Sequence, residues 1–433
     1  MAITGASRID PAVTTSAHDA IATVFRIESP RLIAGLTRIV RDVGLAEELA
    51  QDALVLALER WPETGVPDKP GAWLMTTAKN RAIDRVRHRK LAESKHAALG
   101  RELDEEPALD LDAALDDDLG DDLLRLVFTA CHPVLSSEAR VALTLRLLGG
   151  LTTGEIARAF LVPEPTIAQR IVRAKRTLEE AAVPFEVPRG PELAPRLASV
   201  LDVIYLVFNE GYSATAGDDW MRPALCEDAL RLGRVLAGLM PDEPEVLGLV
   251  SLMEIQASRA AARVGPGGEP VLLLDQNRAR WDRLLIRRGL EALSRAEALG
   301  GAEGTYALQA AIAACHARAA TGDDTDWARI AALYATLAER TGSPVVELNR
   351  AVAVSMAFGP EAGLAIVDAL TAEHALDGYH LLPAVRGDLL TKMGRFAEAR
   401  ASLERAATLT RNLREQKLLR ERAAAVPHPR RDA

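Results

Sequence analysis

The stretch from Leu151 to Glu180 constrains the fold most, because it carries two helical patterns separated by a short break. Thr152 or Thr153 can cap the first helix, since a hydroxyl oxygen accepts a hydrogen bond from first-turn amides. The break lies at 161–163, and a second helix begins at the next residues, where a proline is tolerated because the first-turn nitrogen needs no helical partner. One apolar stripe of this second helix is expected to be buried: Ile167, Ile171, Ala174 and Leu178.

The other faces of the second helix carry hydroxyl, amide and guanidinium groups. These groups can contact base edges and phosphates in the major groove of DNA. They belong to Thr166, Gln169, Arg170, Arg173 and Arg176. The segment therefore predicts a DNA-binding helix-turn-helix. A basic surface helix without a ligand is the alternative that this segment alone leaves open.

Composition favours helices throughout the 433 residues, a length that predicts two or three domains. Aromatic residues make up only 4%, and no run of alternating β-branched residues demands a sheet. No apolar stretch is long enough to span a bilayer, and the first residues lack the apolar core of a signal peptide, so we expect a cytoplasmic protein.

The cysteines Cys131, Cys226 and Cys315 lie far apart and form no CxxC pair, so neither disulfides nor a zinc site are expected. Two of them precede a histidine, in Cys131–His132 and Cys315–His316. Adjacent residues on a helix point about 100° apart, so they cannot easily share a ligand. We interpret both pairs as packing positions.

The apolar pattern predicts three earlier helices: one interrupted near Ser29–Pro30, one at 45–61, and one from Gly71 to about Leu91. The third ends in six lysines and arginines against one acid between residues 78 and 90, with aromatic Trp73 near its start. Such a helix can hold unstacked bases and phosphates, although a solvated helix face is the alternative. Residues 101–122 reverse the balance, with eleven acids against one arginine, and predict a flexible acidic linker.

Three stretches in this order resemble the conserved domains of bacterial sigma factors of the extracytoplasmic-function (ECF) group. They are AEELAQDALVLALERW (46–61), GAWLMTTAKNRAIDRVR (71–87) and LTTGEIARAFLVPEPTIAQRIVRAKRTL (151–178). The resemblance implies that the first two form sigma region 2, which binds a coiled coil of the RNA polymerase β′ subunit and melts and reads the −10 element. The third would lie in region 4, which reads the −35 element and contacts the β-subunit flap.

The resemblance also assigns site residues by position. Those facing the polymerase would be Glu48, Leu49, Gln51, Asp52 and Leu56. Those on the promoter-facing helix would be Trp73, Lys79, Asn80, Arg81, Asp84 and Arg85, and the 62–70 loop would meet an extruded base. Those in the −35 major groove would be Glu164, Thr166, Gln169, Arg170 and Arg173. Pro165 departs from the family, which commonly has glycine or another small residue there.

The second half resembles an extension found in one subgroup of these factors, a helical domain followed by tetratricopeptide-like hairpins. The match lies in FNEGY (208–212) and QNRARWD (276–282). Glycines at 322, 359 and 394 are 37 and 35 residues apart, near the period of about 34 residues of such repeats. The clearest unit is 387–409, with Gly387, Gly394, Ala399 and Ala406 at positions for small side chains. Such hairpins would present a concave surface to a protein or peptide.

Polar residues after an apolar helix form one further cluster: Asn209, Glu210, Tyr212, Asp218, Asp219 and Arg222. An enzyme would need such groups to converge on a pocket and to have shifted pKa values. We interpret them instead as a buried polar network.

We therefore predict an all-α, multidomain sigma factor that is not an enzyme and has no cofactor or metal. The expected domains are region 2 at 1–92, an acidic linker at 93–119, region 4 at 120–184, a helical extension at 190–300 and tetratricopeptide-like repeats at 304–425. The expected partners are RNA polymerase core and promoter DNA, with the C-terminal half as a fused regulatory module. Two alternatives remain: a one-component regulator that senses a ligand in its second half, and a helical enzyme that its first half targets.

Overall fold

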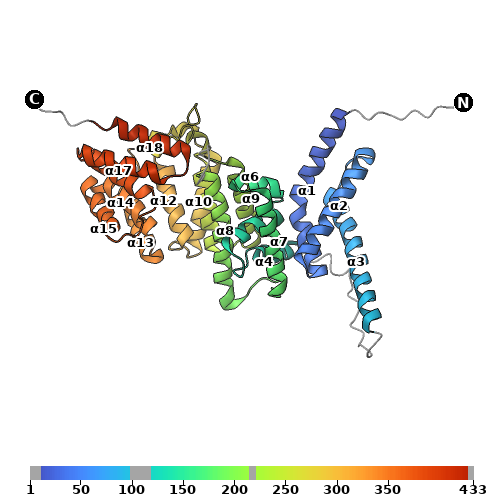
Figure 1. Ribbon diagram of the computed structural model, residues 1–433. Coiled ribbons are helices and arrows are strands. Elements are labelled where there is room, and N and C mark those ends of the chain that lie inside the picture. Colours follow the sequence, from blue (N-terminus) through green and yellow to red (C-terminus); the bar gives the residue numbers. More distant parts are fainter. Residues whose placement is uncertain (1–10, 98–118, 214–220, 428–433) are drawn as a thin grey trace, which may run out of the picture. The chain divides into compact units, whose positions relative to one another are not determined.

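The computed structural model describes residues 11–97, 119–213 and 221–427. These residues form helices joined by turns and contain no β-strand, only an isolated bridge between Val264 and Pro270 (Figure 1). The all-α prediction is therefore confirmed for the described part of the chain. None of the described helices is both long enough and apolar enough to cross a membrane. The chain divides into two compact units, Met1–Val203 and Ile204–Ala433.

Three helices open the first unit: α1 (Pro11–Val40), α2 (Val43–Thr64) and α3 (Pro70–Ala97). They pack against one another, and their contact buries Leu32 and Leu36 of α1 and Leu74 of α3. The turn before α2 is closed by Asp42, whose carboxylate accepts a hydrogen bond from the amide of Leu45 at 3.0 Å.

The expected interruption at Ser29–Pro30 is wrong, because α1 continues through both residues. Pro30 has no amide hydrogen and therefore cannot donate a helical hydrogen bond to the preceding turn. The helix survives because it packs against α2, α3 and α4, which bury both Ser29 and Pro30. The third helix also extends further than expected, to Ala97 rather than about Leu91.

Four shorter helices complete the first unit up to Glu180. They are α4 (Leu119–Ala130), α5 (Ser137–Leu147), α6 (Thr153–Phe160) and α7 (Glu164–Glu180). Helix α7 packs against both α5 and α6, and α4 packs against α5 and α1. The predicted compact helical unit before and including the helix-turn-helix is therefore present.

Helix α8 (Leu193–Tyr212) follows a short 3-10 turn, η2 (Gly190–Glu192). Its first half belongs to the first unit, where the Ser199 hydroxyl donates to the carbonyl of Cys131 at 2.7 Å and Arg196 donates to the carbonyl of Phe128 at 3.0 Å. The start of α8 is thus held by backbone acceptors at the end of α4 and just beyond it.

The second unit continues with helices built around α10. They are α9 (Pro223–Leu239), α10 (Pro244–Ala257), α11 (Arg283–Ala298) and α12 (Thr305–Arg318). Between α10 and α11 lie three 3-10 turns, η3 (Ala260–Ala262), η4 (Leu273–Asp275) and η5 (Arg278–Arg280). Helix α10 contacts α9, α11 and α12, and its residues 246–255 are all buried. It is the central helix of this part of the unit.

Six helices then follow, coloured orange to red in Figure 1. They are α13 (Trp327–Thr341), α14 (Pro344–Phe358), α15 (Pro360–Ala372), α16 (Leu381–Lys392), α17 (Phe396–Leu409) and α18 (Leu413–Ala425). Each packs against the next along the chain. Gly359 and Gly394 have φ values of 102° and 75° in the turns before α15 and α17, a region of backbone conformation that favours glycine.

Candidate nucleic-acid interface

The helix-turn-helix begins with a capping box at Thr152. Its hydroxyl accepts a hydrogen bond from the amide of Glu155 at 3.2 Å, and the Glu155 carboxylate accepts one from the amide of Thr152 at 2.7 Å. Two first-turn amides of α6 are therefore satisfied reciprocally. The cap predicted at Thr152 or Thr153 is confirmed at Thr152.

The turn between the two helices is tight. Leu161 has a left-handed backbone with a φ of 51°, and the amide of Val162 donates to the carbonyl of Ala157 at 3.1 Å. Helix α7 then begins at Glu164, with proline in its first turn as predicted. The buried residues of α7 are those of the predicted stripe: Ile167, Ile171, Ala174 and Leu178.

The opposite face of α7 is open. Glu164, Gln169 and Arg173 are exposed, whereas Thr166 and Arg170 are half-buried. Arg176 is also exposed, but its guanidinium pairs with the Glu180 carboxylate at 2.6 Å. The five residues assigned to the −35 groove thus lie within the first three turns of α7.

Val172 is a residue of this face that the sequence analysis missed. Its side chain is 65% exposed, next to Arg173 on α7. An exposed apolar side chain on a groove-facing helix can contact the methyl group of thymine. The signal was present in the sequence, since Val172 lies outside the stripe that contains Ile171.

The residues assigned to the promoter-facing helix are not equally accessible on α3. Asn80, Asp84 and Arg85 are exposed. Trp73 is half-buried, with its ring 5.2 Å from that of Trp61 in an edge-on contact. Lys79 is buried. The cationic stretch between 88 and 90 lies outside the side chains that the structure describes.

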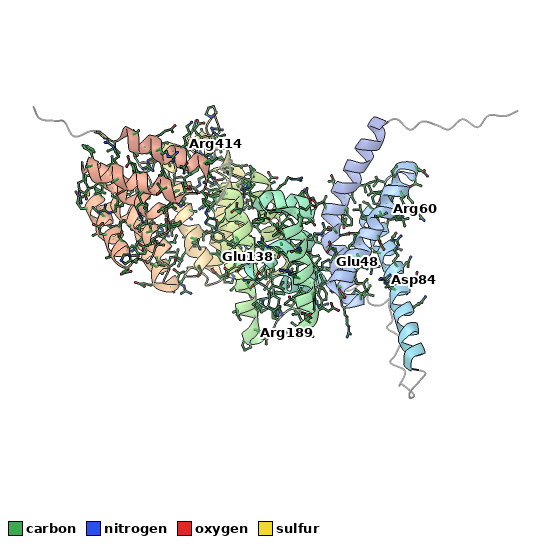
Figure 2. All side chains as sticks on the ribbon, viewed as in Figure 1. Glu48, Arg60, Asp84, Glu138, Arg189 and Arg414 are labelled. Carbon is green, nitrogen blue, oxygen red and sulfur yellow. The ribbon has the colours of Figure 1, made fainter. Side chains whose placement is uncertain are left out.

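The residues assigned to polymerase lie along α2, where Glu48 and Asp52 are exposed, as Figure 2 shows for Glu48. Val55, one turn further, is 53% exposed and extends this acidic face with an apolar group. Gln51 and Leu56 are half-buried, and Leu49 is buried in the core. Asp52 pairs with Arg81 of α3 at 3.1 Å, so the predicted polymerase and promoter residues meet there.

Glu47 lies next to these residues but is buried. Its carboxylate accepts a hydrogen bond from Arg146 Nε of α5 at 2.6 Å, forms an ion pair with Lys175 of α7 and accepts from Gln51. Burial disfavours the charged form, but Lys175 and Arg146 outweigh it and lower the pKa of Glu47. One carboxylate therefore joins α2 to α5 and α7.

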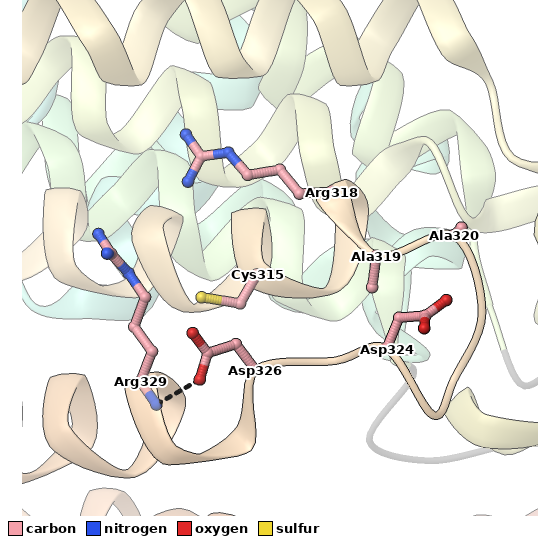
Figure 3. A pocket seen from close by; sticks show the side chains of 7 residues that line it. All are labelled: Cys315, Arg318, Ala319, Ala320, Asp324, Asp326 and Arg329. Atoms are coloured by element: carbon pink, nitrogen blue, oxygen red, sulfur yellow. Dashed lines mark hydrogen bonds between the residues drawn. The ribbon is translucent and has the colours of Figure 1, made fainter.

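The cysteines are packing residues. Cys131 is buried with its sulfur 3.3 Å from the Thr144 hydroxyl, and burial raises the pKa of its thiol to about 11. Cys315 lines a pocket of about 480 Å³, together with Arg318, Asp324 and Asp326 (Figure 3). Burial raises the pKa of this thiol as well, which disfavours the reactive thiolate. Within the described residues, no group of three or more histidine, cysteine or acidic side chains could hold a metal ion.

The structure describes only some residues of the polar cluster predicted after the apolar helix α8. Glu210 forms an ion pair with Arg222, and both side chains are largely buried. Asp218 and Asp219 lie outside the described residues. The Glu210–Arg222 pair agrees with a buried polar network.

Comparison with known families identifies three parts of the chain. Residues 24–91 match sigma-70 region 2, and residues 125–178 match sigma-70 region 4. Residues 196–297 match a family of unknown function, DUF6596. The first two matches contain α2 and α6 and most of α3 and α7, and the third contains the FNEGY and QNRARWD stretches.

Individual relatives agree with these matches. An uncharacterized protein of Rhizobium meliloti (strain 1021) is 44% identical over 396 residues, 90% of this chain and 92% of that protein. The ECF RNA polymerase sigma factor SigK of Mycobacterium ulcerans (strain Agy99) is 31% identical over 168 residues, 37% of this chain and 84% of the relative. SigK of Mycobacterium tuberculosis (strain ATCC 25618 / H37Rv) is 32% identical over 167 residues, 37% of this chain and 86% of the relative.

These matches decide between the functions left open by the sequence. Sigma factors are not enzymes, so the helical-enzyme alternative is wrong, and the matches favour the sigma factor over a one-component regulator. The chain belongs to the ECF sigma factors, which direct RNA polymerase to promoters, and it carries a C-terminal helical extension of the DUF6596 family.

Proposed function

We propose that this sigma factor reads the −35 element with the open face of α7. The observation that supports the proposal is the division of this helix into a fully buried apolar stripe and an exposed polar face. Gln169, Arg170 and Arg173 carry amide and guanidinium groups that can form bidentate contacts with adenine and guanine. The capping box and the tight turn hold α7 at a defined angle for entry into the groove.

Region 2 would then bind the −10 element through α3 and the 62–70 loop. Asn80 and Arg85 are exposed donors on this helix, and Trp73, half-buried against the buried Trp61 ring, gives a partly accessible aromatic group near the loop. Aromatic rings can stack with unpaired bases, and guanidinium groups contact phosphates. Arg81 would also contact a phosphate, once its guanidinium leaves the Asp52 carboxylate for the DNA.

The polymerase contact would lie on α2. Glu48 and Asp52 form an acidic ridge that ends in exposed Val55. By resemblance, this ridge binds the β′ coiled coil, while region 4 contacts the β flap. A cytoplasmic location follows from these partners. Acidic residues around an apolar contact suit a basic partner surface, because complementary charge accelerates and orients association.

We propose the same domain boundaries as the sequence predicts, except at the start of the linker. Helix α3 ends at Ala97 and α4 begins at Leu119, so the first residues of the linker assigned to 93–119 are helical, and 98–118 lie outside the described residues. The extension at 190–300 and the repeats at 304–425 contain α8–α11 and α12–α18, respectively. A tetratricopeptide-like architecture for the latter is supported by the close crossing at Gly387, where a Cβ atom would lie 2.7 Å from Leu403 Cγ.

The C-terminal half would act as a regulatory module, in place of a separate anti-sigma protein, and its hairpins would bind a protein or peptide. The proposal is motivated by its covalent attachment to region 4 through α8. A truncation after Val203 keeps the contacts of Ser199 and Arg196 with region 4 and removes the module. Changed run-off transcription or polymerase affinity supports the proposal, and unchanged values for both contradict it.

The sigma activity itself is tested by co-purification with core polymerase, followed by run-off transcription on genomic fragments. We expect new start sites that appear only with this chain. A gel shift with and without core enzyme separates this function from that of a one-component regulator, which binds duplex DNA specifically without polymerase.

A further inference from the structure

Three arginines of the second unit gather around aromatic rings from the FNEGY and QNRARWD stretches. The guanidinium carbon of Arg263 lies 3.4 Å from the ring centre of Tyr212, and that of Arg259 lies 5.9 Å from the ring centres of both Tyr212 and Trp281. Arg278 lies 4.7 Å from the ring centre of Trp281. Residues from α8, from both ends of the turn η3 and from in and directly after the turn η5 thus meet in one cationic cluster, the Arg259 cluster.

Arg259 is buried in this cluster, and Arg278 is half-buried, with the charge of Asp324 acting on it. Arg259 is only 8% exposed, and among the described residues neither it nor Arg278 forms an ion pair with a carboxylate. Arg259 donates to the Gln256 side chain, and Arg278 donates to the carbonyl of Ala319 at 2.9 Å. Elsewhere in this unit the buried Glu254 pairs with Arg234. Burying a cation such as Arg259 without an ion-pair partner is unfavourable, so an anion next to it would be stabilising.

His316 lies close enough to Arg259 and Arg278 for their positive charges to affect it. It is buried against the Trp327 ring, 5.1 Å away between ring centres. Burial, together with the positive charges of Arg259 and Arg278, lowers the pKa of His316 to about 4. The imidazole is therefore neutral at pH 7, and one of its nitrogens carries a hydrogen that can be donated.

Four buried polar atoms, three of which belong to this cluster or to His316 beside it, have no hydrogen-bond partner among the described residues. They are Arg259 Nε, Gln276 Oε1, Trp281 Nε1 and His316 Nδ1. Each belongs to a side chain that is more than nine-tenths buried. Buried polar atoms without partners are rare, and each calls for an explanation such as a bound ligand. Two of the four are obligatory donors, Arg259 Nε and Trp281 Nε1, and His316 Nδ1 becomes a third in one tautomer.

We propose that the Arg259 cluster binds a small oxyanion, the phosphate or carboxylate group of a ligand. Its oxygens would accept hydrogen bonds from Arg259 Nε, Trp281 Nε1 and His316 Nδ1. Charge-assisted hydrogen bonds of this kind are about twice as strong as neutral ones, and a guanidinium matches the planar or tetrahedral oxygens of these anions. The site gives the C-terminal extension a ligand of defined chemistry and does not depend on which promoter the sigma regions read.

Calorimetric titration of the full chain with inorganic phosphate tests the proposal, with acetate as the carboxylate probe and chloride at equal ionic strength as the control. We expect saturable binding of phosphate or acetate at one site, and none of chloride. The probe that binds also raises the melting temperature by about 5 °C at 100 times its Kd. Absence of saturable binding by both probes overturns the proposal and leaves ordered water as the partner of these atoms.

Variants locate the binding. Trp281→Phe keeps the aromatic ring and removes only the Nε1 donor, so we expect binding to weaken about tenfold or more. Arg259→Gln removes the central charge and should abolish binding. Arg287→Gln removes a charge from an exposed arginine of α11 and serves as the matched control, with unchanged binding. Equal binding by wild type and Trp281→Phe overturns the proposal even where Arg259→Gln does not fold.

Discussion

The Glu47 carboxylate accepts a hydrogen bond from Arg146 Nε at 2.6 Å, across 99 residues of sequence. Glu47 lies in region 2, whereas Arg146 and the second cation, Lys175, lie in region 4. A buried acid thus holds the two sigma regions together within the first unit. Its neighbour Glu48, which is exposed, belongs to the proposed polymerase ridge.

Replacing Glu47 by alanine should destabilise the first unit by about 3 kcal/mol, because Arg146 and Lys175 lose their shared partner in a buried place. Chemical unfolding in urea measures the change. Glu48→Ala is the matched control on the same helix and should change the free energy of unfolding by less than about 0.5 kcal/mol. A similar loss in both variants would contradict a special role for Glu47.

The same carboxylate should make stability depend on pH. Its pKa is lowered in the folded protein, so the folded state holds fewer protons than the unfolded state between the two pKa values. The stabilisation is therefore complete above the unfolded pKa of about 4.3 and is lost as pH falls through the lower folded value. Acid unfolding of wild type and Glu47→Gln, followed by circular dichroism, checks this. The variant should show the weaker pH dependence in this range, and equal pH dependence would rule the effect out.

Two kinds of arginine should behave differently on promoters. Arg170→Ala or Arg173→Ala should cost about 1–3 kcal/mol of binding and relax the preference at one position of the −35 element, if the side chain reads a base. Arg85→Ala should weaken binding to all promoters by the same factor and reduce the salt dependence of binding. Binding of the holoenzyme to a set of −35 variants at several salt concentrations measures both. Identical behaviour of the two classes would remove the distinction between base readers and phosphate anchors.

Neighbouring residues on α7 offer a further contrast. Val172→Ala should weaken binding to promoters with thymine in the contacted position by about 1 kcal/mol and leave folding unchanged, because its side chain is 65% exposed. Ile171→Ala should instead lower the free energy of unfolding by about 2–5 kcal/mol, because Ile171 lies in the buried stripe. Promoter binding and thermal unfolding are measured for both variants. Loss of stability in Val172→Ala would show that the valine packs inside the domain.

The helix-turn-helix could be predicted in detail from the sequence because its determinants are local. The stripe Ile167–Leu178, the cap at Thr152 and the proline in the first turn of α7 act over three or four residues each. The resemblance also identified sigma regions 2 and 4 correctly, because the motifs that carry it are contiguous in the sequence. The burial of Lys79 could be seen only in the packed helices, because the burial of a polar residue depends on which neighbouring helices cover its face.

Tertiary structure decided the remaining features. Helix α1 continues through Pro30 because three neighbouring helices pack against it, which the sequence near the proline does not reveal. The Glu47 joint brings together residues 99 positions apart, and the Arg259 cluster gathers residues from α8 and from in or directly beside η3 and η5. By itself, the sequence determined the helices, the order of the sigma regions and the two fingerprint stretches of the extension. Only folding determined which distant charges are buried together, because long-range contacts depend on packing that no local pattern encodes.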